Sequence, residues 1–282
     1  MDAVQLATFR AVIAEGSFDA AARALHVTPS AVSQRIKALE QDVGQVLVRR
    51  TKPAEPTAAG QALVRLAGQI TLLEREALDA ARGGPESGGR TRISVSVNAD
   101  SLYTWFLPAL ATVPGLALDL HQEDEDYTTD LLRAGTVMAA VTTQQVAVQG
   151  CRVEPLGAMR YLALAAPDTF TGFATSPMVL FNRKDRLQHR FRAALTHRTL
   201  PDPPIHYVPA TAACVEAARL GLGWAMVPAT AAAGDLASGR LVDLAPGRHL
   251  DIPLHWQCWR MESAALTTLT TAVRTAAATA LR

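Results

Sequence analysis

The sequence predicts an α/β protein with an all-α N-terminal head, and three observations support this fold class. Residues 1–82 carry apolar side chains at helical spacing. The segment from Gly83 to Gly89 reads GGPESGG, and its glycines and proline predict a linker. Beyond this segment, short apolar runs alternate with helical patterns. Such alternation is typical of βα units, so we expect a mostly parallel sheet, divided between two lobes.

The expected domain boundaries follow these changes of pattern. A chain of 282 residues is long enough for two or three domains. We place the head at 1–58, the long linker helix at 59–82, the hinge at 83–90, the first lobe (lobe I) at 91–161 and 260–282, and the second lobe (lobe II) at 162–259.

Two adjoining helices are predicted between Ser17 and Gly44. Ser17 can cap the first helix, and Thr28 followed by Pro29 is a typical start for the second. Gly44 is expected to end the second helix. The apolar residues of this helix recur every three or four positions and predict one buried stripe, made of Val32, Ile36, Leu39 and Val43.

The opposite face of the second helix is polar and cationic, which is the composition expected of a helix that reads DNA. Hydroxyls, amides and cations reach base edges and phosphates when a helix lies in the major groove. A short strand at 46–48 is followed by Arg49, Arg50 and Lys52, which predicts a wing that contacts phosphates. The candidate DNA-binding residues are Thr28, Pro29, Ser30, Ser33, Gln34, Arg35, Lys37, Arg49 and Arg50.

Three points limit this interpretation of the head. Helix pairs that bind no nucleic acid are common, so an ordinary amphipathic pair is the alternative. Residues 1–57 hold seven Lys/Arg and six Asp/Glu, so DNA binding would depend on where the cations point rather than on net charge. Arg35 could pair with Glu40 or Asp42 instead of DNA.

The predicted linker helix carries an apolar seam with steps of three and four residues. Its members are Leu63, Leu66, Ile70, Leu73, Ala77 and Ala80. Such spacing is typical of two helices that pack along each other, so we expect Leu63, Leu66, Ile70 and Leu73 to form a dimer contact. Packing of the seam onto its own domain is the alternative.

The remaining elements are expected from short apolar runs and helical patterns. Strands are predicted at 93–97, 116–120, 137–141, 162–164, 178–180, 224–227 and 254–259, with helices at 210–220 and from 263 to the end.

This order of elements resembles that of LysR-type transcriptional regulators. The segment TPSAVSQRIKALEQDVGQVLVRR (28–50) is similar to the winged helix-turn-helix of that family, and TAAGQALVRLA (57–67) to the start of its linker helix. VNADS (97–101), AAVTTQ (139–144), FNRKD (181–185) and LGWAMVP (222–228) are similar to the LysG/ArgP branch, whose members sense basic amino acids and activate an exporter gene.

The resemblance implies several partners and one ligand. It implies a periplasmic-binding-protein-like effector domain with the ligand between its lobes, and a homodimer or homotetramer on double-stranded promoter DNA. RNA polymerase is implied as a further partner, and lysine, arginine or histidine as the effector.

Polar residues at strand ends are the candidates for effector binding. Asn98 to Ser101 occupy a strand-to-helix turn, where backbone amides and the Ser101 hydroxyl could hold an α-carboxylate. A cationic ligand also needs acids, and in the acidic run 123–126 we favour Asp124, although most of this run is expected to be solvated. The full set is Asn98, Asp100, Ser101, Asp124, Thr142, Thr143, Asn182 and Thr211.

Other classes of function lack their motifs. The sequence contains no GxSxG, HExxH, P-loop or GxGxxG, so we expect no catalytic residues, metal ligands or cofactor. Cys151, Cys214 and Cys258 are expected to be buried free thiols. Without a long apolar run or a signal peptide, a cytoplasmic protein with no membrane contact is expected. The alternative function is a stand-alone amino-acid-binding sensor without specific DNA activity.

Overall fold

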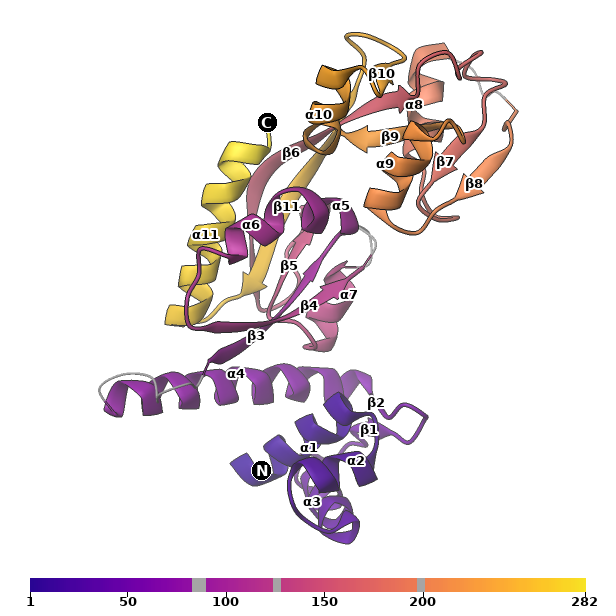
Figure 1. Ribbon diagram of the computed structural model, residues 1–282. Coiled ribbons are helices and arrows are strands. Elements are labelled where there is room, and N and C mark those ends of the chain that lie inside the picture. Colours follow the sequence, from indigo (N-terminus) through magenta and orange to yellow (C-terminus); the bar gives the residue numbers. More distant parts are fainter. Residues whose placement is uncertain (83–89, 124–127, 197–200) are drawn as a thin grey trace.

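The computed structural model describes residues 1–82, 90–123, 128–196 and 201–282. Figure 1 shows a helical head, one long helix beside it, and an α/β domain of two lobes on the other side of that helix. The long helix therefore lies between the head and lobe I.

The head consists of three helices and a two-stranded wing. They are α1 (Ala3–Glu15), α2 (Phe18–Ala24), α3 (Pro29–Val43), β1 (Val48–Arg49) and β2 (Glu55–Pro56). The predicted helix ends are confirmed. The Ser17 hydroxyl accepts a hydrogen bond from the Ala20 amide at 3.1 Å, and the Thr28 hydroxyl accepts one from Ala31 at 3.2 Å. Gly44 ends α3 with φ +71°, a backbone conformation that glycine adopts without strain.

The apolar stripe of α3 is shorter than predicted. Val32, Ile36 and Leu39 are fully buried in the core of the head, but Val43 is 38 % exposed. The helix ends at Val43, and the chain then turns so that Leu47 enters the core instead. The wing strand begins at Val48 rather than at the predicted position 46.

The long helix α4 (Ala58–Ala81) packs on both the head and lobe I. Two of its glycines permit close approach. A Cβ atom on Gly60 would lie 2.3 Å from the Leu47 carbonyl oxygen, and one on Gly68 would lie 2.7 Å from the Trp259 ring. The buried face of the helix is made of Gly60, Val64, Ala67, Gly68 and Leu72. It differs from the predicted seam, where Leu63, Leu66 and Ile70 are half-buried and Leu73 is exposed.

One nine-stranded sheet runs through both lobes, in the order β4-β3-β5-β11-β6-β9-β7-β8, with β10 paired to β6. Its strands are β3 (Thr91–Val97), β4 (Leu116–Gln122), β5 (Ala139–Thr142), β6 (Cys151–Ala165), β7 (Met178–Leu180), β8 (Ile205–Tyr207), β9 (Trp224–Pro228), β10 (Val242–Asp243) and β11 (Leu250–Trp259). Every strand expected from the sequence is present. β6 is longer than expected, and β8 and β10 are additional strands.

The sheet is parallel within each lobe and antiparallel where the lobes join. β3 pairs in parallel with β4 and β5, and β7 pairs in parallel with β8 and β9. The connecting strands β6 and β11 pair antiparallel with each other and with their neighbours. The sheet is therefore less uniformly parallel than we expected, because two long strands cross between the lobes.

The register of these long strands places the lobe boundaries inside them. In β11, His255 to Cys258 pair with β5 of lobe I, although lobe II was expected to extend to 259. Only residues 162–164 of β6 were predicted, and the part that was not predicted contains Pro155 and Gly157, residue types that are uncommon inside strands. Both residues sit at a bulge, where the partner of His255 is Pro155 and that of Leu254 is Gly157.

Eight further helical segments cover the sheet. They are α5 (Ala99–Ser101), the π-helical η1 (Leu102–Phe106), α6 (Leu107–Leu110), α7 (Thr128–Ala134), α8 (Leu187–Thr196), α9 (Thr211–Arg219), α10 (Ala229–Ser238) and α11 (Ala264–Ala280). Figure 1 shows α11 along the side of lobe I beside β6 and β11, and α9 and α10 beside β9 in lobe II. The buried side of α11 joins the main core through Leu266, Leu269 and Val273.

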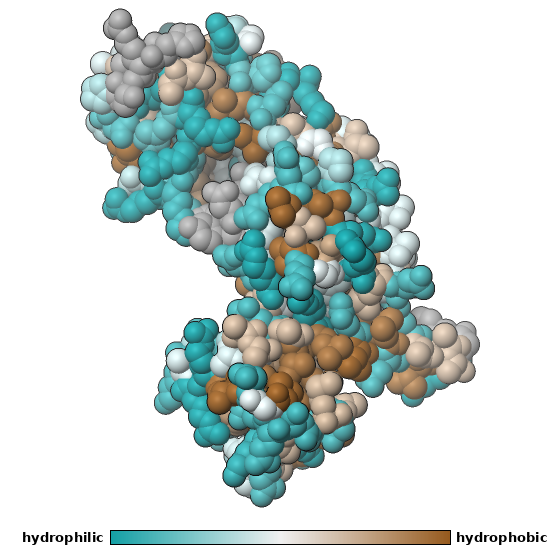
Figure 2. Space-filling view, turned by 180° about the vertical axis from the view of Figure 1, so that it is seen from behind, coloured by the Kyte–Doolittle hydropathy of each residue, from teal (hydrophilic) through white to brown (hydrophobic). Residues whose placement is uncertain are grey.

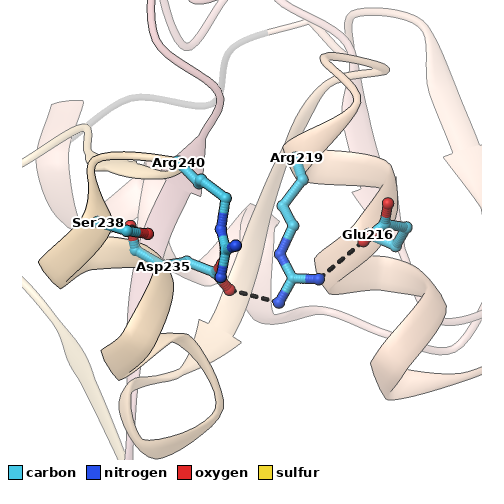
Figure 3. Close-up of polar contacts among 5 residues, drawn as sticks. All are labelled: Glu216, Arg219, Asp235, Ser238 and Arg240. Atoms are coloured by element: carbon cyan, nitrogen blue, oxygen red, sulfur yellow. Dashed lines mark hydrogen bonds and ion pairs between the residues drawn. The ribbon is translucent and has the colours of Figure 1, made fainter.

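A buried carboxylate braces lobe II. Asp235 on α10 is 2 % exposed and receives hydrogen bonds from Arg219 at the end of α9 and from Arg240, whose Nε lies 2.8 Å from Oδ1 (Figure 3). Arg219 also donates to Glu216 at 2.7 Å. These contacts tie the ends of two helices together, and the hydrogen bonds from Arg219 and Arg240 hold the pKa of Asp235 below its ordinary value.

The remaining predictions that the fold tests concern membrane-spanning helices and the cysteine thiols. No helix of the described residues is long and apolar enough to cross a bilayer. Cys151, Cys214 and Cys258 are buried free thiols, as predicted. Burial raises the pKa of Cys151 to about 11 and that of Cys214 to about 12, which keeps both thiols protonated and unreactive.

Candidate functional site

The polar face of α3 points away from the core of the head. Thr28, Pro29, Ser30, Gln34 and Lys37 are exposed, and Ser33 is half-buried. The Thr28 hydroxyl also lies 3.0 Å from that of Ser30, so the first turn of the helix presents two hydroxyls together. A helix with this exposed face has the side chains that base edges and phosphates require.

Arg35 differs from the other residues of this face because it contacts the head itself. Its Nη1 atom donates to the Thr8 hydroxyl on α1 at 3.4 Å. The two acids considered as its partners are engaged elsewhere. Glu40 accepts from the Leu47 and Val48 amides at 2.8 and 3.3 Å, and Asp42 pairs with the N-terminal amine at 2.6 Å. Arg35 is half-buried and braces α3 against α1.

The wing cations differ in their surroundings. Arg49 forms an ion pair with Glu55 across the wing at 3.3 Å. Arg50 lies over the ring of Phe18 on α2, with its guanidinium 4.9 Å from the ring centre. Both residues are exposed. A phosphate would compete with Glu55 for Arg49, whereas the Phe18 ring leaves the hydrogen-bond donors of Arg50 available.

A cleft of about 700 Å³ lies between the two lobes. Its walls come from the strand ends and turns of both lobes and from the connecting strand β11. The lining residues are Asn98, Ala99, Asp100, Gln122, Glu123, Thr143, Gln145, Phe181, Asn182, Lys184, Asp185, Arg186, Leu187, Arg190, Pro209, Ile252 and Pro253.

The structure brings together half of the effector-binding residues expected from the sequence. Asn98, Asp100, Thr143 and Asn182 line the cleft.

Of the other four predicted residues, three lie outside the cleft lining. Ser101 and Thr142 are buried and lie outside its lining. Thr211 lines a cavity of about 30 Å³ that also contacts Asp100. Asp124 lies outside the described residues.

Asp100 connects three parts of the effector domain. Its carboxylate accepts hydrogen bonds from the Tyr161 hydroxyl on β6 and from the Thr211 hydroxyl at the start of α9, both at 2.6 Å. Burial raises the pKa of this carboxyl above its ordinary value, and the two hydroxyl donors only partly offset that rise. Asp100 therefore links lobe I directly to lobe II. Sequence reasoning missed Tyr161, because nothing in its strand pattern distinguishes it from a core residue.

The FNRKD turn of lobe II is held by its own side chains. The Asn182 side chain accepts from the Lys184 amide at 2.7 Å and from the Asp185 amide at 3.1 Å. The Asp185 carboxylate accepts from the Phe181 amide at 3.0 Å and from the Leu187 amide at 2.9 Å. These bonds fix the backbone of the turn at the cleft.

Sequence reasoning also missed three cations that line the cleft, namely Lys184, Arg186 and Arg190. The signal was present, since residues 183–192 read RKDRLQHRFR and hold five Lys/Arg. A run of cations is usually a solvated surface, and only the fold shows that part of this run faces the cleft. Among the described residues, no group of three His, Cys, Asp or Glu side chains could hold a metal ion.

Two models of known families match this chain. Residues 4–61 match the family of bacterial regulatory helix-turn-helix proteins of the lysR family. Residues 86–282 match the LysR substrate binding domain.

Individual relatives match over the whole chain. A curated relative, the lysine export transcriptional regulatory protein LysG of Corynebacterium glutamicum, is 42 % identical and covered in full by this chain. The crystal structure of ArgP from Mycobacterium tuberculosis is 47 % identical with a TM-score of 0.90, covering 100 % of this chain and 99 % of that one. Full-length LysG from C. glutamicum with bound effector Arg is 41 % identical with a TM-score of 0.81, and both chains are covered completely.

Proposed function

The chain belongs to the LysR family of bacterial helix-turn-helix regulators, and we propose that it senses a basic amino acid and controls the gene of an amino-acid exporter. One observation carries this proposal: a single helix, α4, packs on a head with an exposed polar helix and on the domain that holds the cleft. Ligand binding and DNA reading are thereby connected within one chain. Lysine, arginine and histidine are the proposed effectors, supported by the names of the relatives.

In the proposed DNA complex, α3 lies in the major groove. Ser30, Ser33 and Gln34 face base edges, whereas Lys37 and Arg50 contact phosphates. Thr28 and Pro29 bring the start of the helix close to the DNA backbone. Arg35 supports α3 from the side of α1, and Arg49 reaches a phosphate when it leaves Glu55.

In the proposed effector complex, the amino acid lies in the cleft between the lobes. Asn98, Asp100, Thr143 and Asn182 contact it, while Ser101, Thr142 and Thr211 support these residues from the surrounding structure. The carboxylate of Asp100 attracts a cationic group of the ligand. Asp124 stays a prediction from the sequence.

The proposed response to the effector is a population shift between arrangements of the lobes. Asp100 holds Tyr161 and Thr211 at 2.6 Å, and a bound cation would compete for the same carboxylate. A ligand that binds one lobe arrangement more tightly favours it. The change would reach the DNA through α4, in a homodimer or homotetramer joined by the seam of α4. RNA polymerase is the proposed further partner.

The test of this function is retardation of DNA from the region upstream of the protein's own gene, with and without lysine, arginine and histidine. We expect retardation at low ionic strength and a change in affinity or in the footprint when an effector is added. A stand-alone sensor would bind the amino acid but retard no DNA fragment, and that outcome would overturn the proposal.

Two variants separate base reading from phosphate contact in the same assay. We expect Gln34→Ala to cost about 1–3 kcal/mol at one base step and to change which sequences are preferred. Arg50→Ala should weaken all sequences alike and reduce the dependence of affinity on salt, because a phosphate contact is lost. The same footprint and salt dependence in both variants would contradict these roles.

A further inference from the structure

The charged side chains of the cleft are segregated by lobe. Lobe I contributes acids, Asp100 and Glu123. Lobe II contributes three cations, Lys184, Arg186 and Arg190, together with Asp185. A cleft with acids on one wall and cations on the other is complementary to an elongated ligand with opposite charges at its ends.

Among the described residues, the acid within the lobe II set forms no ion pair with the cations beside it. Both oxygens of Asp185 are engaged by main-chain amides, those of Phe181 and Leu187. In the described ranges, no carboxylate forms an ion pair with Arg186 or Arg190, and both arginines are exposed. Their guanidinium groups thus remain available to an anion that enters the cleft.

Arg186 and Arg190 are arranged so that both can contact one group. Arg186 directly precedes α8 and Arg190 lies in its first turn, with the Arg190 amide donating to the Arg186 carbonyl oxygen at 2.8 Å. Residues four positions apart lie on the same side of a helix. Both side chains line the cleft, so the pair presents two planar, permanently charged donors to it.

The opposite wall is a poor place for a carboxylate. The turn at 98–101 was expected to bind the α-carboxylate, but both acids that lobe I contributes to the cleft lining, Asp100 and Glu123, are on that wall. The Ser101 hydroxyl is fully buried and does not reach the cleft. An anion placed there would meet two acids, whereas a cation would be attracted.

We propose that Arg186 and Arg190 form the subsite for the α-carboxylate of the effector, so that its side-chain cation points toward Asp100 and Glu123 of lobe I. This inference rests on the proposed function and adds the orientation of the ligand. A basic amino acid bound in this way contacts lobe II at one end and lobe I at the other. Both ends are then needed to hold the lobes in one arrangement. Compounds that keep the amine and lack the carboxylate should bind weakly.

The test is calorimetry of the full-length protein with L-lysine, L-lysinamide and cadaverine, which differ at the α-carboxylate. We expect the native protein to prefer lysine over lysinamide by about tenfold or more, the effect of a charge-assisted contact. In the double variant Arg186→Gln, Arg190→Gln this preference should fall to about one. Because the same two ligands are compared on both proteins, differences between the ligands themselves cancel.

Two further variants serve as controls. Arg183→Gln removes a neighbouring exposed cation that lies over the Tyr207 ring, 4.8 Å from its centre, and does not line the cleft. It should keep the preference for lysine. The double variant Arg186→Lys, Arg190→Lys retains both charges and should restore part of the preference.

The outcomes distinguish this inference from the proposed function. If the native protein binds no basic amino acid, the proposed function fails and this subsite fails with it. If it binds lysine but the double glutamine variant keeps the full preference over lysinamide, only the orientation is overturned. An equal loss of the preference for lysine in Arg183→Gln would also overturn the proposed orientation. The preference would then arise from the overall positive charge of lobe II rather than from contacts with Arg186 and Arg190.

Discussion

At the scale of single residues, Asp100 and Asp235 show how surroundings decide the behaviour of one side-chain type. Both carboxyl groups are largely removed from solvent, and each accepts two side-chain hydrogen bonds. The donors of Asp235 are guanidinium groups, which favour the ionised form and lower its pKa. The donors of Asp100 are neutral hydroxyls, so burial dominates and its pKa rises. The Asp235 carboxylate therefore braces lobe II, whereas the Asp100 carboxyl group lines the cleft.

We expect Asp235→Asn to lower the free energy of unfolding by about 2 kcal/mol at neutral pH, because two charge-assisted hydrogen bonds weaken. The pKa of Asp235 is lower in the folded protein than its ordinary value of about 3.9 in the unfolded chain. The stabilisation by Asp235 is therefore complete at pH values above about 3.9, and it is lost as the pH falls through the lower, folded pKa. Urea unfolding at pH 7 and at about pH 3.5 measures both effects, and the difference between the two proteins should shrink at the lower pH.

The matched control is Glu216→Gln. Glu216 also pairs with Arg219, but its side chain is 52 % exposed, so we expect a change of no more than about 0.5 kcal/mol. Equal losses in the two variants, or a loss in Asp235→Asn that does not depend on pH, would contradict this account.

At the scale of elements, α4 is joined to lobe I by a cap that the sequence did not reveal. Glu76 of α4 accepts from the Ser263 hydroxyl at 2.6 Å and from the Ala265 and Ala264 amides at 3.0 and 3.3 Å. These groups form the first turn of α11, so an acid from one helix satisfies the start of another. Glu76 and Ser263 are 187 positions apart, and no local pattern predicts their contact.

We expect Glu76→Gln to destabilise the protein by about 1 kcal/mol, since the charge that favours the N-terminus of α11 is lost. Hydrogen exchange should become faster at the Ala264 and Ala265 amides. Glu74→Gln on the exposed side of α4 is the control and should change neither quantity. Unchanged exchange at both amides in Glu76→Gln would show that the cap does not hold the two helices together.

At the scale of the whole molecule, we propose that a second copy binds on the uncovered side of α4. Leu73 of the predicted seam is 45 % exposed in the single chain, and Figure 2 shows hydrophobic surface at the level of α4, between the head and the effector domain. Large apolar side chains left open along a regular seam are typical of helices that pair. The buried face of the same helix is already taken by the head and lobe I.

We expect Leu73→Glu to weaken the dimer by about 100-fold, because each of two copies loses a buried leucine and gains a charge. Sedimentation and the retardation assay should then show monomers and weaker DNA binding. Leu78→Glu is the control, since Leu78 is 50 % exposed on the same helix but lies outside the seam. Dissociation caused equally by both variants would place the dimer contact elsewhere.

The local elements of this protein were determined by its sequence. Caps such as Ser17 and Thr28 and the glycine at 44 act within a few positions, so they could be predicted and are confirmed. The buried stripe of α3 is confirmed at Val32, Ile36 and Leu39. The exposed polar face of α3 follows from the same periodicity.

The tertiary structure alone decided which distant residues meet. It joined the two lobes through β6 and β11, brought Thr211 to Asp100 across 111 positions, and turned Arg186 and Arg190 toward the cleft. It also left Ser101 and Thr142 buried outside the cleft lining. The physical reason is that a periodic pattern specifies which face of an element is buried, whereas the neighbour on that face depends on the packing of the whole chain.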